Sequence, residues 1–176
     1  MPIFSEDKIK IAELEDAAEI TYLLNKAYRG EEAKKGWTTE SDIIAGNQRT
    51  VPEEVQELID RDRSYFLVYK DDDKIIGCIN AQVKDKGMYV GMLSVEPSLQ
   101  NSGIGKKLLH ASEELADVNN CTCCYMTVID VRKELIDFYK RIGYADTGER
   151  IPFEEDGVSG KHLQPLQFMV MKKDLA

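Results

Sequence analysis

A glycine turn in the segment "VEPSLQNSGIGKKLLH", residues 95–110, has the residue types and spacing to bind an anion. A strand-like run ends at Pro97, and Gly103 and Gly105 stand at the start of an amphipathic helix. The first N–H groups of a helix have no internal partner and attract anions, and glycine lets a bulky ligand approach the backbone. Further donors and positive charge come from the polar residues of the segment, which are Gln100, Asn101, Ser102, Lys106 and Lys107. The segment therefore predicts a pyrophosphate cradle, with a purely structural tight turn as the alternative.

Two nucleotide-binding motifs do not match this turn. "QNSGIGKK" lacks the Gly-x4-Gly-Lys-Ser/Thr spacing of the P-loop. The third glycine of a dinucleotide fingerprint is also absent, because Leu108 stands there, and the preceding strands form a meander instead of a βαβ unit. The anion site is therefore expected to serve another kind of phosphate-bearing ligand.

The composition is that of an ordinary globular protein, with 43% apolar and 31% charged residues among 176. No apolar run approaches the roughly 18 residues of a membrane span, and the N-terminus lacks the apolar core of a signal peptide, so we expect a cytoplasmic protein with no membrane partner. A net charge of −9 argues against a nucleic-acid partner. Three of the four cysteines crowd into "CTCCY", which favours buried structural thiols and no metal site.

Hydrophobic periodicity predicts a mixed order of helices and strands in a single domain, residues 1–176. The fold class is α/β (α+β), with a mixed, partly antiparallel central sheet flanked by helices. Strand 88–97 is expected at its centre, and the crossover rule makes strand 121–129 parallel to it. Asp16 and Glu19 predict a capping box at the first helix. Helices are expected from Asp16 to Ala27, from Thr50 to Ile59, from Ile104 to Val118 and over 131–143, and strands over 8–14, 64–69, 74–83, 88–97, 121–129, 144–151 and 163–175.

Two segments resemble elements of the GCN5-related N-acetyltransferases, the GNAT family. "QNSGIG" resembles their Q/R-x-x-G-x-G/A element, and "FYKRIGY", residues 138–144, resembles their FY-x-x-x-G-F/Y segment. The distance between the two segments and the intervening helix and strand also agree. The resemblance implies a GNAT-like fold and acetyl transfer from acetyl-CoA to an amine.

The resemblance also implies how the cofactor is held. Backbone amides from Ser102 to Lys106 would bind the pyrophosphate of acetyl-CoA, and the strand ending at Val95 would offer backbone groups to the pantetheine. That strand is expected to splay from its neighbour and open a slot for the thioester, with Gly91 marking either a bulge or a plain packing gap. Arg132 replaces an Asn found in many members, and it is expected either to pair with Glu134 or Asp137 or to reach the phosphates. The cofactor-binding candidates are Leu93, Val95, Gln100, Asn101, Ser102, Gly103, Ile104, Gly105, Lys106 and Arg132.

Tyr139 is the candidate catalytic acid. A phenol with a pKa of about 10 can protonate a thiolate that forms beside it, and the matching Tyr does so in many family members. Packing within its helix is the alternative role for this residue. No base is assigned, because Glu40, Asp42, Tyr89 and Asp130 all remain possible.

The acceptor is expected to contact the segments 29–50 and 152–164, which usually set specificity in this family. Glu31, Trp37 and Glu40 are the substrate-binding candidates, because an aromatic ring beside carboxylates can hold an ammonium group. The first choice of acceptor is a small or amino-acid-like amine, and a protein N-terminus or lysine is the second. A non-catalytic acyl-CoA-binding module and a nucleotide-binding module are the competing functions. A monomer or a homodimer is expected.

Overall fold

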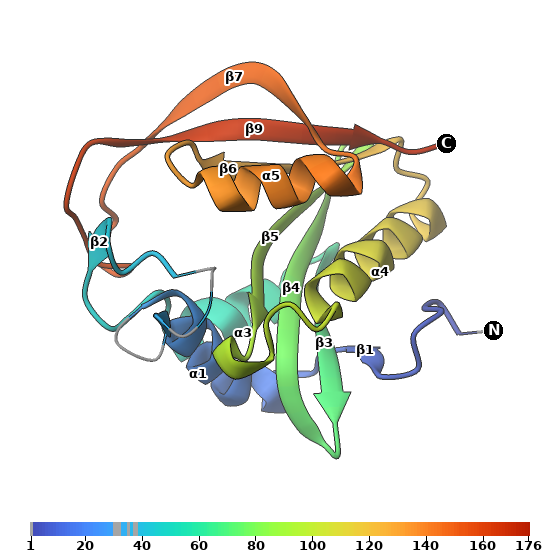
Figure 1. The fold of residues 1–176 in the computed structure, drawn as a ribbon. Coiled ribbons are helices and arrows are strands. Elements are labelled where there is room, and N and C mark those ends of the chain that lie inside the picture. Colours follow the sequence, from blue (N-terminus) through green and yellow to red (C-terminus); the bar gives the residue numbers. More distant parts are fainter. Residues whose placement is uncertain (1, 30–32, 35, 37–38) are drawn as a thin grey trace.

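The computed structural model describes residues 2–29, 33–34, 36 and 39–176. Within them, seven strands form one mixed sheet in the order β1-β3-β4-β5-β6-β9-β7 (Figure 1). The sheet consists of β1 (Ile9–Ile11), β3 (Ser64–Asp71), β4 (Lys74–Lys84), β5 (Gly87–Val95), β6 (Cys123–Ile129), β7 (Ala145–Phe153) and β9 (Leu166–Asp174). The helices are α1 (Ala17–Tyr28), α3 (Pro52–Asp60), α4 (Ile104–Val118) and α5 (Lys133–Ile142), with 3-10 turns at Leu14–Asp16 and Pro97–Leu99. None of the described helices is long and apolar enough to cross a membrane.

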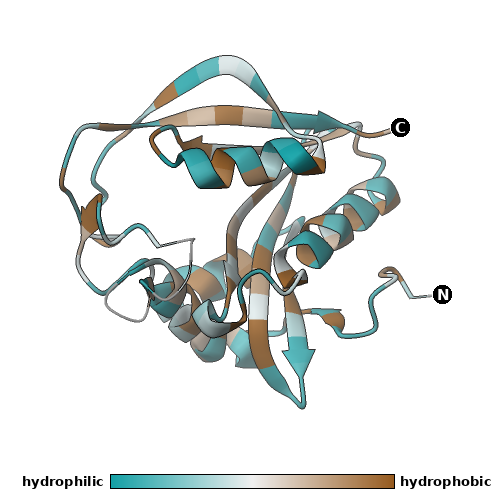
Figure 2. Ribbon diagram, viewed as in Figure 1, coloured by the Kyte–Doolittle hydropathy of each residue, from teal (hydrophilic) through white to brown (hydrophobic). Residues whose placement is uncertain are grey.

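The sheet is covered on both faces, and the strand pattern explains why. Along β3, Phe66 and Val68 pack in one apolar cluster with α1 and α3, whereas Leu67 and Tyr69 pack in a second cluster with α4 and α5. Side chains of a strand alternate between faces, so a strand buried on both sides needs an unbroken apolar run. Figure 2 shows this hydrophobic stretch in the strands, together with the hydrophilic tip of the β3–β4 hairpin.

The predicted element order and the central position of β5 are confirmed. β3, β4 and β5 form the antiparallel meander, and β5 pairs with β6 in parallel. The predicted capping box is wrong in its partners. Asp16 Oδ2 accepts a hydrogen bond from the N–H of Glu13 at 2.8 Å, and Glu19 Oε2 accepts one from the N–H of Ile75 at 2.7 Å. Glu19 bonds to the sheet because the N–H of Ile75 needs an acceptor there.

A short second ladder joins the two segments that were expected to set specificity. β2 (Ile44–Ala45) pairs with β8 (Lys161–His162), in the registers Ile44↔His162 and Ala45↔Lys161. Sequence pattern alone missed this ladder, because two-residue strands carry no period. The ladder holds the segment after α1 against the segment between β7 and β9.

β5 separates from β6 after three residue pairs, the last being Tyr89↔Tyr125. A bulge bends β5 just after this point. Asn80 of β4 pairs with Gly91 and Cys78 pairs with Ser94, so two residues of β5 lie opposite one residue of β4. Met92 lies within the bulge in the left-handed region, with φ of +55°. β6 stays paired with β9 from Cys123 to Ile129. The two strands therefore diverge, as the resemblance implied, and Figure 1 shows β5 running away from β6.

Candidate active site

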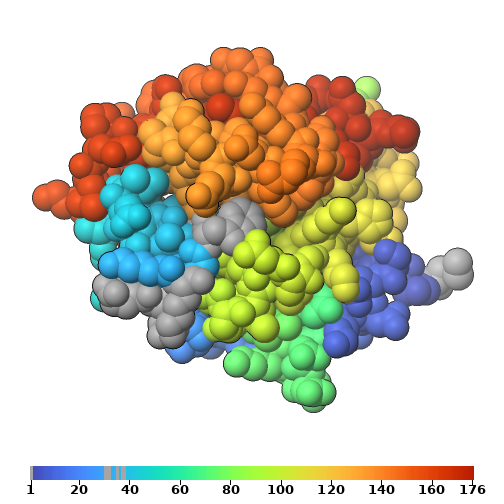
Figure 3. Space-filling model, in the orientation of Figure 1, coloured from blue at the N-terminus to red at the C-terminus, as the bar shows by residue number. Residues whose placement is uncertain are grey.

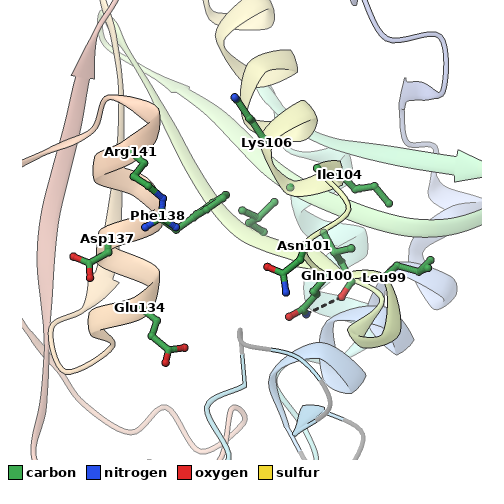
Figure 4. A pocket seen from close by; sticks show the side chains of 13 residues that line it. Leu99, Gln100, Asn101, Ile104, Lys106, Glu134, Asp137, Phe138 and Arg141 are labelled. Carbon is green, nitrogen blue, oxygen red and sulfur yellow. Dashed lines mark hydrogen bonds between the residues drawn. The ribbon is translucent and has the colours of Figure 1, made fainter.

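The glycine turn forms one wall of a cleft of about 440 Å³, which we call the glycine cleft (Figure 4). α5 forms the facing wall, and Phe138 points from α5 across the cleft in Figure 4. The cleft is lined by Leu93, Val95, Leu99, Gln100, Asn101, Gly103, Ile104, Gly105, Lys106, Glu134, Asp137, Phe138 and Arg141. In Figure 3 the same two walls meet at the surface, where residues 96–106 (yellow-green) face α5 (orange).

The start of α4 presents backbone donors to this cleft. Gly103 caps the helix with φ of +88°, a left-handed conformation that favours glycine. The N–H of Lys107 bonds to the carbonyl of Gly103 at 3.1 Å, so the amides of Ile104, Gly105 and Lys106 precede the helical ladder. Lys106 and Arg141 add positive charge from the two walls. The arrangement suits a diphosphate.

The missing side chain of Gly105 leaves the cleft open between its walls. A Cβ placed there would lie 3.9 Å from Leu93 Cδ2, Val95 Cγ2 and Phe138 Cζ. The cleft is therefore a cradle that a larger residue at this position would fill. An extended phosphate-bearing ligand such as acetyl-CoA fits this space and these donors.

Ser102 and Gln100 bond within their own loop and strand. The hydroxyl of Ser102 donates to the carbonyl of Leu99, and Ser102 does not line the cleft. Gln100 Nε2 donates to the carbonyl of Val95 at 3.1 Å. Because Glu96 directs its N–H to Ile76 of β4, the backbone groups of Val95 point to the side of β6. Val95 therefore directs its N–H to the opening between the strands, and its carbonyl on the same side accepts the hydrogen bond from Gln100.

A second cleft of about 300 Å³, which we call the tyrosine cleft, follows the diverging ends of β5 and β6. Leu93 lines both clefts, so they adjoin at the bent part of β5. The carbonyl of Leu93 accepts a hydrogen bond from the hydroxyl of Tyr28. The polar residues that line this cleft are Tyr28, Glu40, Arg49, Glu54, Asn80, Gln82, Tyr89, Thr127, Arg132 and Tyr139.

Tyr139 is buried on α5 and borders the tyrosine cleft. Its helix begins after Arg132 and ends at Gly143, whose φ of +114° terminates the helix in the left-handed conformation. Burial raises the pKa of the Tyr139 hydroxyl above its ordinary value, and the neighbouring Tyr28 adds to this effect. Burial likewise raises the pKa of Tyr28 to about 12. Both phenols therefore hold their protons at neutral pH.

A buried charge cluster borders the tyrosine cleft, which two of its members, Glu40 and Arg132, line. Glu40 Oε1 pairs with Arg29 Nη1, and Glu40 Oε2 lies 3.3 Å from Arg132 Nη1. Arg29 Nε donates to the carbonyl of Ser159 at 2.8 Å, and Arg132 Nη2 donates to the carbonyl of Thr39 at 3.2 Å. Removing one partner of such a buried pair typically costs about 3–5 kcal/mol. The cluster therefore fastens the segment after α1, the start of α5 and the segment before β8 to one another.

The predicted site residues fall into two groups. All the cofactor candidates except Ser102 and Arg132 line the glycine cleft, whereas Arg132 lines the tyrosine cleft and pairs with Glu40. Its predicted partners Glu134 and Asp137 line the glycine cleft instead. Both carboxylate oxygens of Glu40 are engaged by arginines, and its contact with substrate stays a prediction. The candidates Glu31 and Trp37 lie outside the described residues.

Two of the four candidate bases line the tyrosine cleft, and the other two line neither cleft. Glu40 and Tyr89 line the tyrosine cleft, and the hydroxyl of Tyr89 lies 3.0 Å from Thr127 Oγ1. Asp130 Oδ2 accepts a hydrogen bond from Gln167 at 2.7 Å, and Asp42 is exposed. Glu40 and Tyr89 are thus the two candidates on this list that line the tyrosine cleft.

Sequence reasoning missed several residues of both clefts. Arg141 stands three residues after Phe138, so helical spacing puts both on one face of α5. Asn80 and Gln82 are polar residues two apart in an otherwise apolar strand, a period that puts both on one sheet face. Arg49 and Glu54 gave no such signal, because they lie at the end of an irregular segment and in the first turn of α3.

Comparison with known proteins assigns the family. Residues 26–164 match the model of the acetyltransferase (GNAT) domain, and the chain therefore belongs to the GNAT family of acetyltransferases. It is an N-acetyltransferase that uses acetyl-CoA, as the two sequence segments implied.

Solved structures share the fold at low sequence identity. yncA from Salmonella typhimurium, solved with acetyl-CoA, is 18% identical over 98% of this chain and 95% of that chain, with a TM-score of 0.70. The ribosomal-protein-alanine N-acetyltransferase from Brucella melitensis is 16% identical over 95% and 99%, with a TM-score of 0.71. Nourseothricin acetyltransferase is 20% identical over 65% and 67%, with a TM-score of 0.57. The acceptors in the last two names, a ribosomal-protein alanine and nourseothricin, differ, so the fold does not specify one.

Replacing Gly105 by Leu is expected to weaken coenzyme A binding strongly without unfolding the protein. Gly105 lies within α4, where a residue other than glycine raises helix propensity by up to about 1 kcal/mol. The added side chain would extend beyond the Cβ position that touches both walls, and coenzyme A affinity should fall by roughly a hundredfold, or about 2.8 kcal/mol. Isothermal titration calorimetry measures the affinity, and thermal unfolding measures the stability.

Gly105→Ala is the matched control, because its Cβ makes only ordinary van der Waals contact with the cleft walls. It should bind coenzyme A nearly as well as the unchanged protein. Full affinity in the Leu variant would exclude the glycine cleft as the cofactor site.

Proposed function

We propose that this protein transfers an acetyl group from acetyl-CoA to the primary amine of a small molecule, by direct attack, with Tyr139 as general acid. The proposal rests on one observation: Leu93 lines both the glycine cleft and the tyrosine cleft, so the two clefts adjoin. One cleft has donors for a diphosphate, and the other has a buried phenol. A thioester held between them would meet an amine from the second cleft.

The glycine cleft holds the cosubstrate in this proposal. Acetyl-CoA supplies an activated acetyl group on a thioester. The amides of Ile104, Gly105 and Lys106 bind its diphosphate, and the backbone groups of Val95 bind the pantetheine. A fixed position converts the reaction into an effectively unimolecular step, which is a large part of the barrier that such an enzyme must lower.

Tyr139 supplies a proton at its phenolic oxygen. Attack of the neutral amine on the carbonyl forms the C–N bond and breaks the C–S bond. A neutral phenol beside the departing sulfur can protonate it as charge develops, and the proton that the amine nitrogen loses, directly or through water, restores the phenol. Burial disfavours the phenolate, but it also disfavours a thiolate formed in the same place. Transfer of the proton from the phenol to the sulfur is therefore still favoured. A mere binding module has no use for an acid at this point.

The size of the tyrosine cleft supports a small acceptor. Its volume of about 300 Å³ lies at the lower end of the range for small-molecule pockets, which is about 300–1,000 Å³. An extended peptide would need a longer groove.

The protein is also proposed to act as one domain over residues 1–176. Its cytoplasmic location and its monomeric or homodimeric state stay predictions.

Tyr139→Phe is expected to lower kcat by roughly 100-fold to 10,000-fold, the contribution typical of general acid–base catalysis. Coenzyme A affinity should not change, because Tyr139 does not line the glycine cleft. Thiol release during turnover and calorimetric titration with coenzyme A measure the two quantities.

Tyr144→Phe is the matched control for this variant. Tyr144 is also buried, and its ring centroid lies 6.0 Å from that of Tyr139, but it lines neither cleft. It should keep its kcat. An unchanged kcat in Tyr139→Phe would remove the phenol from the mechanism.

The pH profile of kcat/KM is expected to rise with the titration of the acceptor amine and to show no falling limb below about pH 10. The pKa of Tyr139 is raised, so its protonated form persists above the pH at which a free phenol ionises. An initial-rate series from about pH 6 to about pH 10 tests this. A falling limb in that range, absent from Tyr139→Phe, would mean that the phenol ionises at an ordinary pKa.

A further inference from the structure

Arg49 and Glu54 line the tyrosine cleft, and neither makes an ion pair with the residues that the structure describes. Other charges of this region are satisfied, because Glu40 pairs with both Arg29 and Arg132. Arg49 also attracts Asp156 electrostatically, but no ion pair joins the two side chains, so the guanidinium retains N–H donors for a ligand of opposite charge. Arg49 is thus the cation that the described cleft leaves for a ligand.

The position of Arg49 is fixed by its backbone. Asn25 of α1 accepts hydrogen bonds from the N–H groups of Arg49 and Thr50 through Oδ1, and donates through Nδ2 to the carbonyl of Thr50 at 3.2 Å. The guanidinium lies over the ring of Tyr28, with Cζ 5.8 Å from the ring centroid. The hydroxyl of that same ring bonds to the carbonyl of Leu93, the residue shared by the two clefts. Arg49 is therefore held close to the bend in β5.

The charges that line the tyrosine cleft balance, although the chain as a whole is acidic. Arg49 and Arg132 stand against Glu40 and Glu54, in a chain with a net charge of −9. A polyamine would find no excess of negative charge here. An acceptor that carries one amine and one anionic group matches a cleft that presents both signs.

We propose that the acceptor is an amine that also carries a carboxylate, and that Arg49 binds this carboxylate. This inference rests on the proposed function. A guanidinium matches a carboxylate through two parallel N–H···O bonds, which fixes orientation as well as charge. Arg49 is then a specificity-determining residue that selects amino-acid-like acceptors and turns the amine away from its own end of the cleft.

The test uses matched amines: several α-amino acids, the corresponding amino-acid amides and the decarboxylated amines. Binding to the protein in the presence of coenzyme A is measured by calorimetry, and acetylation is measured with acetyl-CoA by thiol release. The unchanged protein should prefer the carboxylates in both measurements. Arg49→Gln should raise their KM roughly tenfold to a hundredfold, the range for losing one hydrogen bond to a charged group, because the Gln amide can still donate one of the two bonds; it should leave the amides unaffected.

Two further variants separate a specific contact from a general charge effect. Arg49→Lys keeps the charge but loses the paired geometry, so it should restore part of the affinity. Glu54→Gln removes the other unpaired charge of the cleft and should not change the preference for carboxylates over amides. Thermal unfolding checks that each variant folds.

The outcomes distinguish the inference from the proposed function. Preference for the amides or decarboxylated amines, or an Arg49→Gln variant that keeps the carboxylate preference, would overturn the inference and leave amine acetylation standing. Failure of every carboxylate to bind would also overturn it. Carboxylates that bind through Arg49 without being acetylated would sustain the inference about the site and overturn the proposed function.

Discussion

The separation of β5 from β6 after Tyr89 is the constraint on which the site depends. A parallel pair that stayed in register would use its backbone groups on each other and leave no space between the strands. The extra residue near Met92 bends β5, and β6 keeps its full ladder with β9. Backbone groups at Val95 thereby become available to a ligand, and the buried face of α5 with Tyr139 borders the gap. The strained backbone of Met92 is a cost that the surrounding sheet offsets.

The buried charge cluster gives the gap its second boundary. Glu40 joins two arginines from segments 103 residues apart, Arg29 and Arg132. The ladder between β2 and β8 brings the segment after β7 to the same place. Tyr28 then lies against the bend in β5, and Tyr139 lies on the helix that begins after Arg132. The cluster thus contributes to the site by holding these segments in place, because its charges already pair with one another.

Much of the fold was predictable because its causes are local. Periods of two and 3.6 residues gave the order of strands and helices, and the glycine at position 103 marked the start of α4. The two family-like segments assigned the cofactor. The bulge was only half predicted, because Gly91 drew attention to it, whereas the residue with positive φ is Met92. The pairing of Arg132 with Glu40, and the place of Arg49 in the cleft, depend on contacts distant in sequence. The spacing of residues along the sequence does not predict such contacts.

A crystal structure of the protein with coenzyme A would show directly where the cofactor lies. We expect the diphosphate to lie against the amides of residues 104–106 and the sulfur to lie in the gap between β5 and β6, beside Tyr139. Coenzyme A on another surface, or a sulfur that lies outside this gap and away from Tyr139, would exclude the gap as the place of acetyl transfer.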